Sequence, residues 1–314
     1  MGNQQPAVRK KRRSKTLIKT NLQLSILALP AFLLLLVFSY LPMGGLVLAF
    51  KKYNVVDGIF GSPWCGWANF EFFFSSQDAA RVLRNTLLLN AMFITVSTIL
   101  AVIFALMLFE IKKRWVVKTF QTIFVIPSLV SWVVVGYISY AILQPQNGLL
   151  NNVLGMLGIQ PIMWYSMPQY WPWILLFFSL WKGLGMSLLY YYAALMGVDE
   201  SMFEAAKLDG ANRLQMSWYI SLPFLVPTII ILTILHIGNI FRADFGLFYN
   251  ITQDIGALYP TTDVIDTYIY RALSQIGDIG MSTAVGFFQS IVGFVMIYLT
   301  NFIVNKIDSD KALF

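Results

Sequence analysis

Polar and small residues recur inside two of the most apolar stretches of this chain. They are Ser179, Lys182 and Gly183 in the first stretch, and His236, Asn239 and Arg242 in the second. A polar group inside a membrane is costly and usually faces a partner group or a cavity. Hydroxyl, amide and imidazole groups on one helix face can hydrogen-bond a hydroxyl-rich solute. The pattern therefore indicates that these residues face a cavity or a partner group inside the membrane.

Other kinds of chemistry lack the residues that they need. The chain has one cysteine, Cys65, and one histidine, so a protein metal site is not expected. Its carboxylates are scattered rather than clustered with a histidine, as a membrane enzyme would require. The phosphate-binding pattern GxxxxGK[ST] does not occur, so the chain is not expected to hydrolyse ATP. We predict no catalytic residue, no metal ligand and no bound cofactor.

The composition is that of a protein that crosses the membrane several times. The 314 residues are 58% apolar and 12% charged, whereas a soluble domain carries about 25% charge. A helix needs about 20 apolar residues to cross the hydrocarbon core. Six windows qualify: 24–50, 84–109, 117–143, 171–195, 224–247 and 282–305. The sequence predicts an all-α membrane protein with six transmembrane helices.

Lysine and arginine set the orientation of these spans. Fifteen of them fall in the segments 1–23, 110–119, 196–223 and 306–314. Four fall in the alternate segments 51–83, 144–170 and 248–281. Because positive charge stays in the cytoplasm, both termini are expected there. The basic tail 1–23 suits contact with anionic lipid rather than nucleic acid, and the span behind it is too long for a signal peptide.

The cytoplasmic segment 196–223 is predicted to be a helical hairpin. Asp199 or Ser201 can cap its first helix, and Ser201-x-x-Glu204 fits a capping box. A turn follows at Asp209-Gly210, and Pro223 is expected to begin the fifth span. Elsewhere, Asn85 or Thr86 should cap the second span, and Pro172 should stand in the first turn of the fourth. The mild negative charge of the hairpin suits docking on a protein better than contact with anionic lipid.

The hairpin resembles the EAA loop of binding-protein-dependent ABC importer permeases. The match comprises Glu204-Ala205-Ala206, Gly210, Ile220 and Leu222-Pro223, with no departure from the pattern. Other segments are similar to carbohydrate permeases of the poly- and oligosaccharide type. These are "GSPWCGWANFEFFF", "QTIFVIPSLVSWVV", "NGLLNNVLGMLGI" and "TTDVIDTYIYRAL". The resemblance covers the chain from about residue 25.

The resemblance implies a type I importer permease with a MetI-like core over 84–305, after an extracytoplasmic loop at 51–83. Such a subunit is not an enzyme. It forms half of a pore with a second permease, usually as a heterodimer in the bacterial cytoplasmic membrane. A cytoplasmic ABC ATPase dimer binds ATP and Mg, and an extracytoplasmic solute-binding protein delivers the oligosaccharide.

The resemblance also assigns residues to two roles. The ATPase-coupling residues are Phe203, Glu204, Ala205, Ala206, Asp209, Gly210, Ile220, Leu222 and Pro223. The substrate-pathway residues that it implies are Ser179, Gly183, Met186, His236, Asn239 and Ala243. Lys182 and Arg242 are added because polar groups inside a span usually face a cavity, and Trp181 or Tyr190 because sugar rings need a flat apolar face. Structural roles stay open as alternatives: Lys182 could snorkel or pair with a carboxylate of the partner, and Arg242 could pair with Asp244.

Two other functions compete with the importer subunit. An ion-coupled secondary sugar transporter would favour repeated halves, broken helices and carboxylates in the middle of spans. A membrane-embedded sugar transferase would favour clustered carboxylates at a membrane face. The sequence shows no internal repeat and no such cluster.

Overall fold

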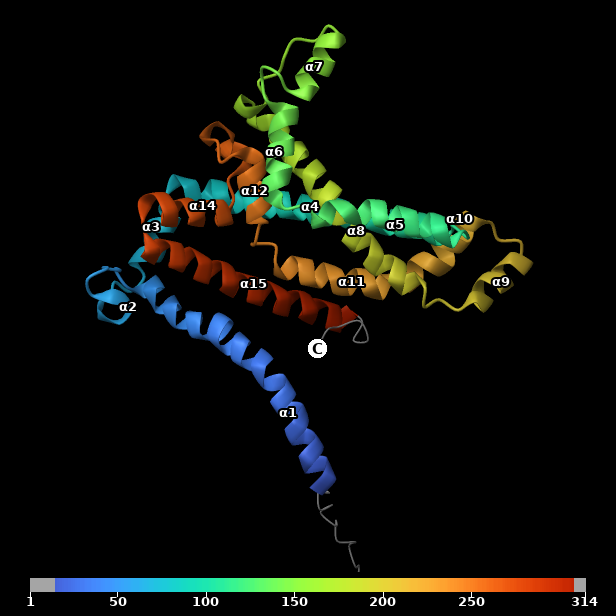
Figure 1. Cartoon of the computed structure of the whole chain (residues 1–314), viewed down its shortest axis with the longest axis horizontal. Coiled ribbons are helices and arrows are strands. Elements are labelled where there is room, and N and C mark those ends of the chain that lie inside the picture. The colour runs from blue at the N-terminus through green and yellow to red at the C-terminus, as the bar shows by residue number, and fades with distance from the viewer. Residues whose placement is uncertain (1–14, 308–314) are drawn as a thin grey trace, which may run out of the picture.

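The computed structural model describes residues 15–307, and the regular elements in that range are helices. Four long helices follow the long axis of the molecule (Figure 1). They are α4 (Gln77–Phe109), α5 (Arg114–Leu129), α11 (Leu222–Gly238) and α15 (Ile279–Ile307). A fifth, α8 (Trp171–Leu195), crosses obliquely and packs against α4, α5 and α11. The predicted all-α membrane fold is confirmed.

The helices that can span a membrane number five or six within the described residues, and two of the predicted spans are interrupted. The span 171–195 is correct, with Pro172 in the first turn of α8. The span 117–143 is instead two helices, α5 and α6 (Trp132–Leu143), which meet at 94°. The span 224–247 stops at Gly238, and the chain resumes as α12 (Phe245–Thr252). Both predictions of an unbroken helix were wrong.

The second span begins earlier than predicted, at Gln77 rather than at 84. Ser76 caps α4 by accepting a hydrogen bond from the Ala79 amide at 3.2 Å. Asn85 and Thr86, which the sequence suggested as caps, are buried inside the helix. The predicted outer loop 51–83 therefore contains the first turns of α4, after α2 (Gly58–Gly61) and α3 (Ala68–Phe74).

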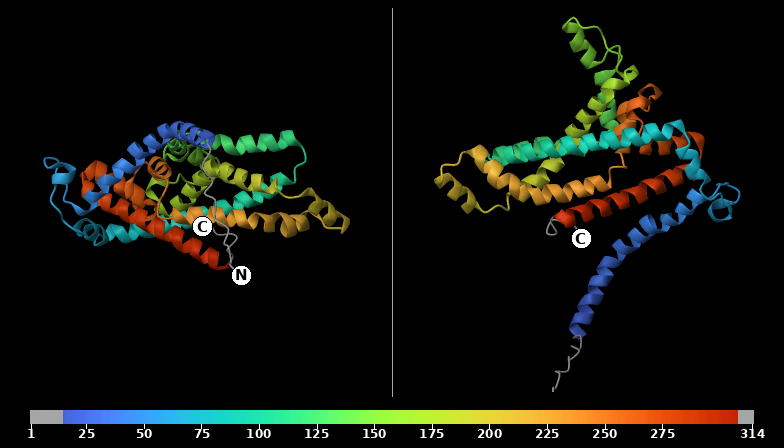
Figure 2. Two further views of the ribbon diagram at one scale, coloured as in Figure 1. Left: turned by 90° about the horizontal axis from the view of Figure 1, so that it is seen from below. Right: turned by 180° about the vertical axis from the view of Figure 1, so that it is seen from behind.

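The first apolar helix diverges from the bundle. α1 (Lys15–Leu35) continues through a π-helical turn (Leu36–Tyr40) into a 3₁₀ segment (Leu41–Phe50) that packs on α15. Figures 1 and 2 show the start of α1 well away from the other helices. Its most apolar window has no buried residue, so this surface must meet lipid or another protein. Residues 1–14 and 308–314 of the two predicted tails lie outside the described residues.

Buried charges hold together the end of the molecule where α4 begins. The fully buried carboxylate of Asp263 lies between the guanidinium groups of Arg81, at 3.0 Å, and Arg271. Arg271 also pairs with Asp254 at 2.9 Å. Asp263 stands between α13 (Tyr259–Thr262) and α14 (Ile265–Arg271). The network therefore ties the segment after α12 to the start of α4.

Small residues set the closest helix contacts. A Cβ added at Gly185 of α8 would lie 2.0 Å from the Phe124 carbonyl oxygen of α5. Similarly, a Cβ at Gly238 would lie 2.0 Å from Ile297 of α15. Membrane helices lack a hydrophobic driving force between them and rely on such close backbone approach.

Gly185→Ala should therefore destabilise the protein, because the added methyl group meets backbone rather than a side chain that can move. We expect a loss of about 1–3 kcal/mol, the usual cost of overpacking, visible as a lower melting temperature of the detergent-purified chain. Gly183→Ala, two residues away on the same helix, is the matched control because nothing lies within 4 Å of its added Cβ. Equal melting temperatures for the two variants would contradict the prediction.

Candidate functional site

A cavity of about 590 Å³ lies between α4, α8, α11 and α12. Five of the predicted substrate-pathway residues line it: Ser179, Gly183, His236, Asn239 and Arg242. The two helices that flank the polar hairpin thus present their polar positions to one space, as the sequence pattern predicted. The side chains of His236, Asn239 and Arg242 are exposed in the single chain, so the cavity is open on one side.

Several lining residues were missed by the sequence reasoning. They are the polar residues Asn90, Ser97, Thr98 and Ser187, with Tyr191 beside Tyr190. Ser97 and Thr98 follow Asn90 by seven and eight residues, about two helical turns, so all three lie on one face of α4. That spacing within an apolar helix is the signal that could have identified α4 as a third polar wall.

Three predicted pathway residues do not line the cavity: Lys182, Met186 and Ala243. Met186 is exposed elsewhere on α8. The Ala243 amide donates a hydrogen bond of 2.7 Å to the Asp266 carboxylate. Trp181, the suggested flat face for a sugar ring, also lies outside the lining, whereas Tyr190 belongs to it.

Lys182 instead donates hydrogen bonds to carbonyl groups at the end of α5 that have no partner within the helix. Its ammonium group donates hydrogen bonds to the carbonyl oxygens of Ser128, at 2.8 Å, and Val130, at 2.7 Å. It also lies 5.1 Å from the centre of the Trp132 ring at the start of α6. Broken helices in a membrane persist only where other groups satisfy the freed carbonyls. Lys182 thus supports the bend between α5 and α6.

Side chains from two other helices stabilise the break after α11. The Asn90 amide donates hydrogen bonds to the carbonyls of Ile240, at 2.7 Å, and Arg242, at 3.1 Å. Gln289 of α15 donates another to the Phe241 carbonyl. The connection is therefore a fixed structure on the cavity wall rather than a slack loop.

Asp244 connects the break between α5 and α6 with the break between α11 and α12. Its carboxylate caps α12 by accepting from the Leu247 amide at 3.3 Å, and it accepts from the Trp132 indole at 2.8 Å. Among described residues, Arg242 forms no ion pair, so the suggested pair with Asp244 is not found. Arg242 lines the cavity, and its charge also acts on the carboxylate of Asp266 in α14.

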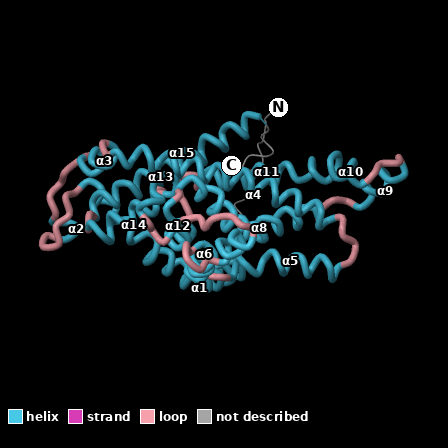
Figure 3. The backbone as a smooth tube through the Cα atoms, turned by 90° about the horizontal axis from the view of Figure 1, so that it is seen from above, coloured by secondary structure: helices cyan, strands magenta, loops and turns pink. Residues whose placement is uncertain are grey.

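The polar hairpin lies at the far end of the molecule from α2 and α3 (Figure 3). It consists of α9 (Glu200–Leu208), α10 (Arg213–Met216) and a π-helical turn (Ser217–Ser221) that runs without a break into α11. The prediction that the fifth span begins at Pro223 was therefore wrong. Gly210, with φ +81°, ends α9. The Ala211 amide bonds the Ala206 carbonyl at 2.9 Å, and the Gly210 amide bonds the Lys207 carbonyl at 3.1 Å, as in a Schellman motif.

Of the two predicted caps for the first helix of the hairpin, Asp199 is correct and Ser201 is not. Asp199 caps α9 by accepting from the Ser201 amide at 2.9 Å, and these hydrogen bonds lower the pKa of its carboxyl group. The predicted box of Ser201 with Glu204 is absent. A capping box instead joins Asn212 and Gln215 at the start of α10.

The predicted coupling residues divide between two faces of the hairpin. Phe203 faces inward, with its ring 5.7 Å from that of Phe109 on α4, and Ile220 and Leu222 also pack on the interior. The exposed coupling residues are Glu204, Ala205, Asp209, Gly210 and Pro223, and Ala206 is half-buried. Leu208, expected with Phe203 to fill a groove of a partner, is 90% exposed. α9 thus presents Glu204 and Leu208 outward and is anchored through Phe203.

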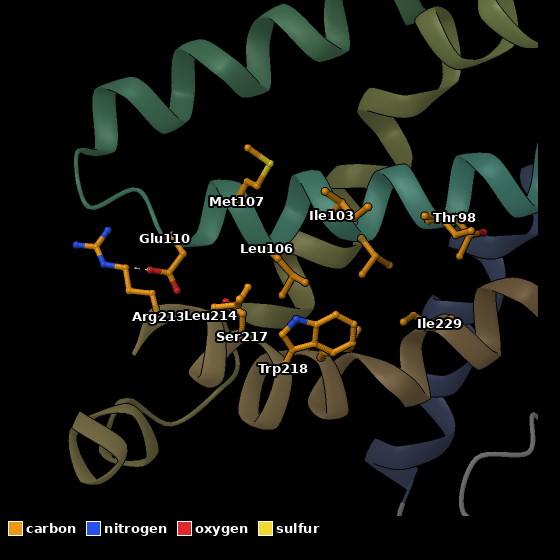
Figure 4. A pocket seen from close by; sticks show the side chains of 13 residues that line it. Thr98, Ile103, Leu106, Met107, Glu110, Arg213, Leu214, Ser217, Trp218 and Ile229 are labelled. Atoms are coloured by element: carbon orange, nitrogen blue, oxygen red, sulfur yellow. Dashed lines mark ion pairs between the residues drawn. The ribbon is translucent and has the colours of Figure 1, made fainter. Parts of the chain in front are cut away.

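An apolar groove of about 750 Å³ runs between α4 and the continuous helix formed by α10, the π-helical turn and α11 (Figure 4). Trp218 and Leu214 face Leu106 and Ile103 across it, and the ion pair of Arg213 with Glu110, at 3.9 Å, closes one end. The groove and the cavity are neighbours on α4, since Thr98 lines both of them.

Comparison with known proteins identifies the family. Residues 97–309 match the family described as "Binding-protein-dependent transport system inner membrane component". The chain belongs to this family. The polygalacturonan/rhamnogalacturonan transport system permease protein YteP of Bacillus subtilis (strain 168) is 33% identical over 310 residues, 96% of each chain. The permease identity predicted from the EAA loop is confirmed.

Solved structures agree with this assignment. A bacterial ABC transporter involved in the import of the acidic polysaccharide alginate contains a chain with a TM-score of 0.84 and 32% identity. The match covers 93% of this permease and 98% of that chain. A second structure, of the bacterial alginate ABC transporter in complex with an alginate pentasaccharide-bound periplasmic protein, gives a TM-score of 0.83 and 31% identity. This permease is an inner membrane component of an ABC transporter.

Lys182→Met tests whether this residue supports the bend or contacts substrate. Loss of the ammonium group leaves the Ser128 and Val130 carbonyls without their donor. We expect a destabilisation of about 1–3 kcal/mol, measured as a lower melting temperature of the purified protein. Lys118→Met on the exposed face of α5 removes the same charge and should leave the melting temperature unchanged. A stable Lys182→Met variant that only binds substrate more weakly would support the pathway role instead.

Proposed function

We propose that this permease forms half of the pore of an ATP-driven importer for oligosaccharides that carry acidic sugars. The observation that carries this proposal is the open, polar cavity between α4, the middle of α8 and the end of α11. Hydroxyls of Ser179 and Ser187 and the amide of Asn239 offer donors and acceptors for sugar hydroxyl groups, while Asn90, whose N–H groups bond the Ile240 and Arg242 carbonyls, offers only its oxygen as an acceptor. A second permease would complete the open side, as in the ABC importers that this chain resembles.

The acidic character of the substrate is inferred from two features. Two of the relatives that are more than 30% identical are named for polygalacturonan/rhamnogalacturonan and for alginate, whereas relatives that are 25–30% identical are named for arabinooligosaccharides, lactose or trehalose/maltose. In this chain, Arg242 brings a guanidinium group to the cavity wall and forms no ion pair with a described residue. Guanidinium binds carboxylate in a paired geometry, so Arg242 is placed to bind a uronate carboxylate.

We assign one partner protein to each end of the molecule. We infer that the exposed face of α9 docks in a cytoplasmic ABC ATPase dimer, which binds ATP and Mg. A solute-binding protein would deliver the sugar from the outside, at the end that carries α2, α3 and α14. We also infer, from the distribution of lysine and arginine, that both termini lie in the cytoplasm. An ion-coupled transporter or a sugar transferase is not favoured, because the chain belongs to the family of ABC transporter permeases, although broken helices also occur in ion-coupled transporters.

Glu204→Lys tests the coupling assignment. Glu204 is exposed, so the reversal should leave folding intact while it removes a contact with the ATPase. We expect co-purification of the ATPase and sugar uptake to fall by about tenfold or more, as for loss of a buried charged contact at an interface. Glu200→Lys, in the first turn of the same helix, is the charge-matched control and should retain most uptake. Normal uptake by Glu204→Lys would refute the coupling role.

Arg242→Gln tests the acidic substrate. The variant should take up oligogalacturonates about tenfold or more slowly than the parent, because a charge-assisted hydrogen bond is lost. Arg242→Lys should recover part of the rate, since it restores the charge without the paired geometry. Uptake is measured in proteoliposomes that contain both permeases and the ATPase, with the binding protein added. An unchanged rate for Arg242→Gln would remove the reason to assign the carboxylate to this residue.

A further inference from the structure

The groove between α4 and the continuous helix of α10, the π-helical turn and α11 can hold an apolar chain. It measures about 750 Å³, within the range of about 300–1,000 Å³ that is usual for ligand pockets. Ile103 and Leu106 form one wall, and Leu214 and Trp218 form the other (Figure 4). An exposed apolar surface of this size marks a contact with lipid or with another protein.

The length of the groove matches one leaflet of a bilayer. Its lining runs along α4 from Thr98 to Glu110, a separation of twelve residues, which is about 18 Å at 1.5 Å per residue. The hydrocarbon core is about 30 Å thick, so one leaflet contributes about 15 Å. A partner helix that crosses the membrane would need a surface about twice as long. An acyl chain from a single leaflet therefore fits the groove better than a spanning helix does.

Tryptophan side chains mark the end of the groove that carries the hairpin as the level of the lipid headgroups. Trp218 lies in the groove wall, and Trp115 lies in the first turn of α5, which a short connection, residues 110–113, joins to α4. Both side chains are exposed. Tryptophan is enriched where hydrocarbon meets water, because its ring is apolar and its N–H group is polar. A lipid chain in the groove would therefore have its headgroup at this end.

The same end is strongly basic. Arg213 stands there, and its 3.9 Å pair with Glu110 leaves the arginine side chain 74% exposed. Lys112, Lys113 and Arg114 follow Glu110 in the chain and are all exposed. None of these three forms an ion pair with another described residue. These five residues carry a net charge of +3, which complements an anionic headgroup.

We propose that the groove binds one anionic phospholipid of the cytoplasmic leaflet. One acyl chain lies along Ile103 and Leu106, and the phosphate accepts hydrogen bonds from Arg213 at the mouth. Basic pockets between membrane helices bind anionic headgroups in this way. The inference rests on the proposed function only for the leaflet, because that function places the hairpin in the cytoplasm. Since Thr98 lines both the groove and the main cavity, the bound chain fills the space between α4 and α11 beside the cavity.

Native mass spectrometry of the purified complex in detergent tests the acyl-chain contact. The complex is titrated with dioleoyl phosphatidylglycerol, which is anionic, or with dioleoyl phosphatidylcholine, which has no net charge. We expect the parent to retain one more phosphatidylglycerol than Ile103→Trp, because the indole ring of the variant occupies the groove. Ile126→Trp makes the same change at an exposed position of α5 outside the groove, and it should retain as many as the parent.

Arg213→Gln tests the headgroup contact separately. The variant should bind phosphatidylglycerol about five- to tenfold more weakly than the parent, the effect of losing one cation near a lipid headgroup. Its binding of phosphatidylcholine should stay unchanged. Lys207→Gln removes another exposed cation of the hairpin that does not line the groove, so it is the matched control and should bind both lipids as the parent does.

The results that would overturn the proposal are distinct. Loss of the lipid from Ile126→Trp as well as from Ile103→Trp would show general contact with lipid rather than a site. Equal affinity of the parent for the two lipids would remove the headgroup contact. Release of the second permease by Ile103→Trp, with the retained lipid unchanged, would make the groove a protein interface. A complex that retained the lipid but imported no sugar would refute the proposed function and leave the lipid site standing.

Discussion

The structure depends on satisfying backbone groups where two helices stop inside the bundle. Hydrocarbon offers no hydrogen bonds, so each freed carbonyl needs a donor from the protein. Lys182 supplies two donors at the end of α5, and Asn90 supplies two at the end of α11. Because these donors come from α8 and α4, the breaks are fixed relative to the helices that form the other cavity walls. The cavity exists because α11 stops at Gly238 and the chain turns away.

Close helix packing supports these breaks at short range. Gly238, the last residue of α11, lies against Ile297, and Gly293 lies against the Gly238 carbonyl, so the end of α11 is held directly on α15. Gly246 lies under the Trp132 ring, which allows Trp132 to reach Asp244. A larger side chain at these positions would separate elements whose polar contacts need distances near 3 Å. Glycine here serves close approach rather than backbone flexibility.

The sequence predicted features that depend on local signals, and it failed where distant residues decide. The apolar length of α8 and Pro172 in its first turn placed that helix correctly, and the turn at Gly210 follows from residue type. The bend after Leu129 was missed although Pro127 near the end of α5 and Ser131, which caps α6, are local signals of a break. The donor for the freed carbonyls could not be predicted, because it is Lys182, more than fifty residues later in the chain. The same lysine was expected to face the substrate, since its charge alone does not reveal the carbonyls that it binds.

Prediction of the cavity residues was incomplete for the same reason, because residues distant in the sequence form the cavity together. His236 and Asn239 could be predicted because they are polar positions of a single apolar helix, yet the α4 wall went unrecognised. Asn90 has two functions that its sequence context does not separate: its amide bonds the Ile240 and Arg242 carbonyls, and it also lines the cavity. Only the fold brings residues 90 and 240 together.

The continuous helix between the hairpin and the cavity offers a physical route for coupling. Residues 213–238 form one helical segment, which at 1.5 Å per residue is about 39 Å long. Ile220 and Leu222, in the first half of the segment, pack on the interior, and His236, near its other end, lines the cavity. The segment is continuous but not regular throughout, because it contains the π-helical turn Ser217–Ser221 and Pro227. We infer that a push on α9, which contacts α4 through Phe203, reaches α11 through this turn and displaces its end against Asn90, whose hydrogen bonds fix the break.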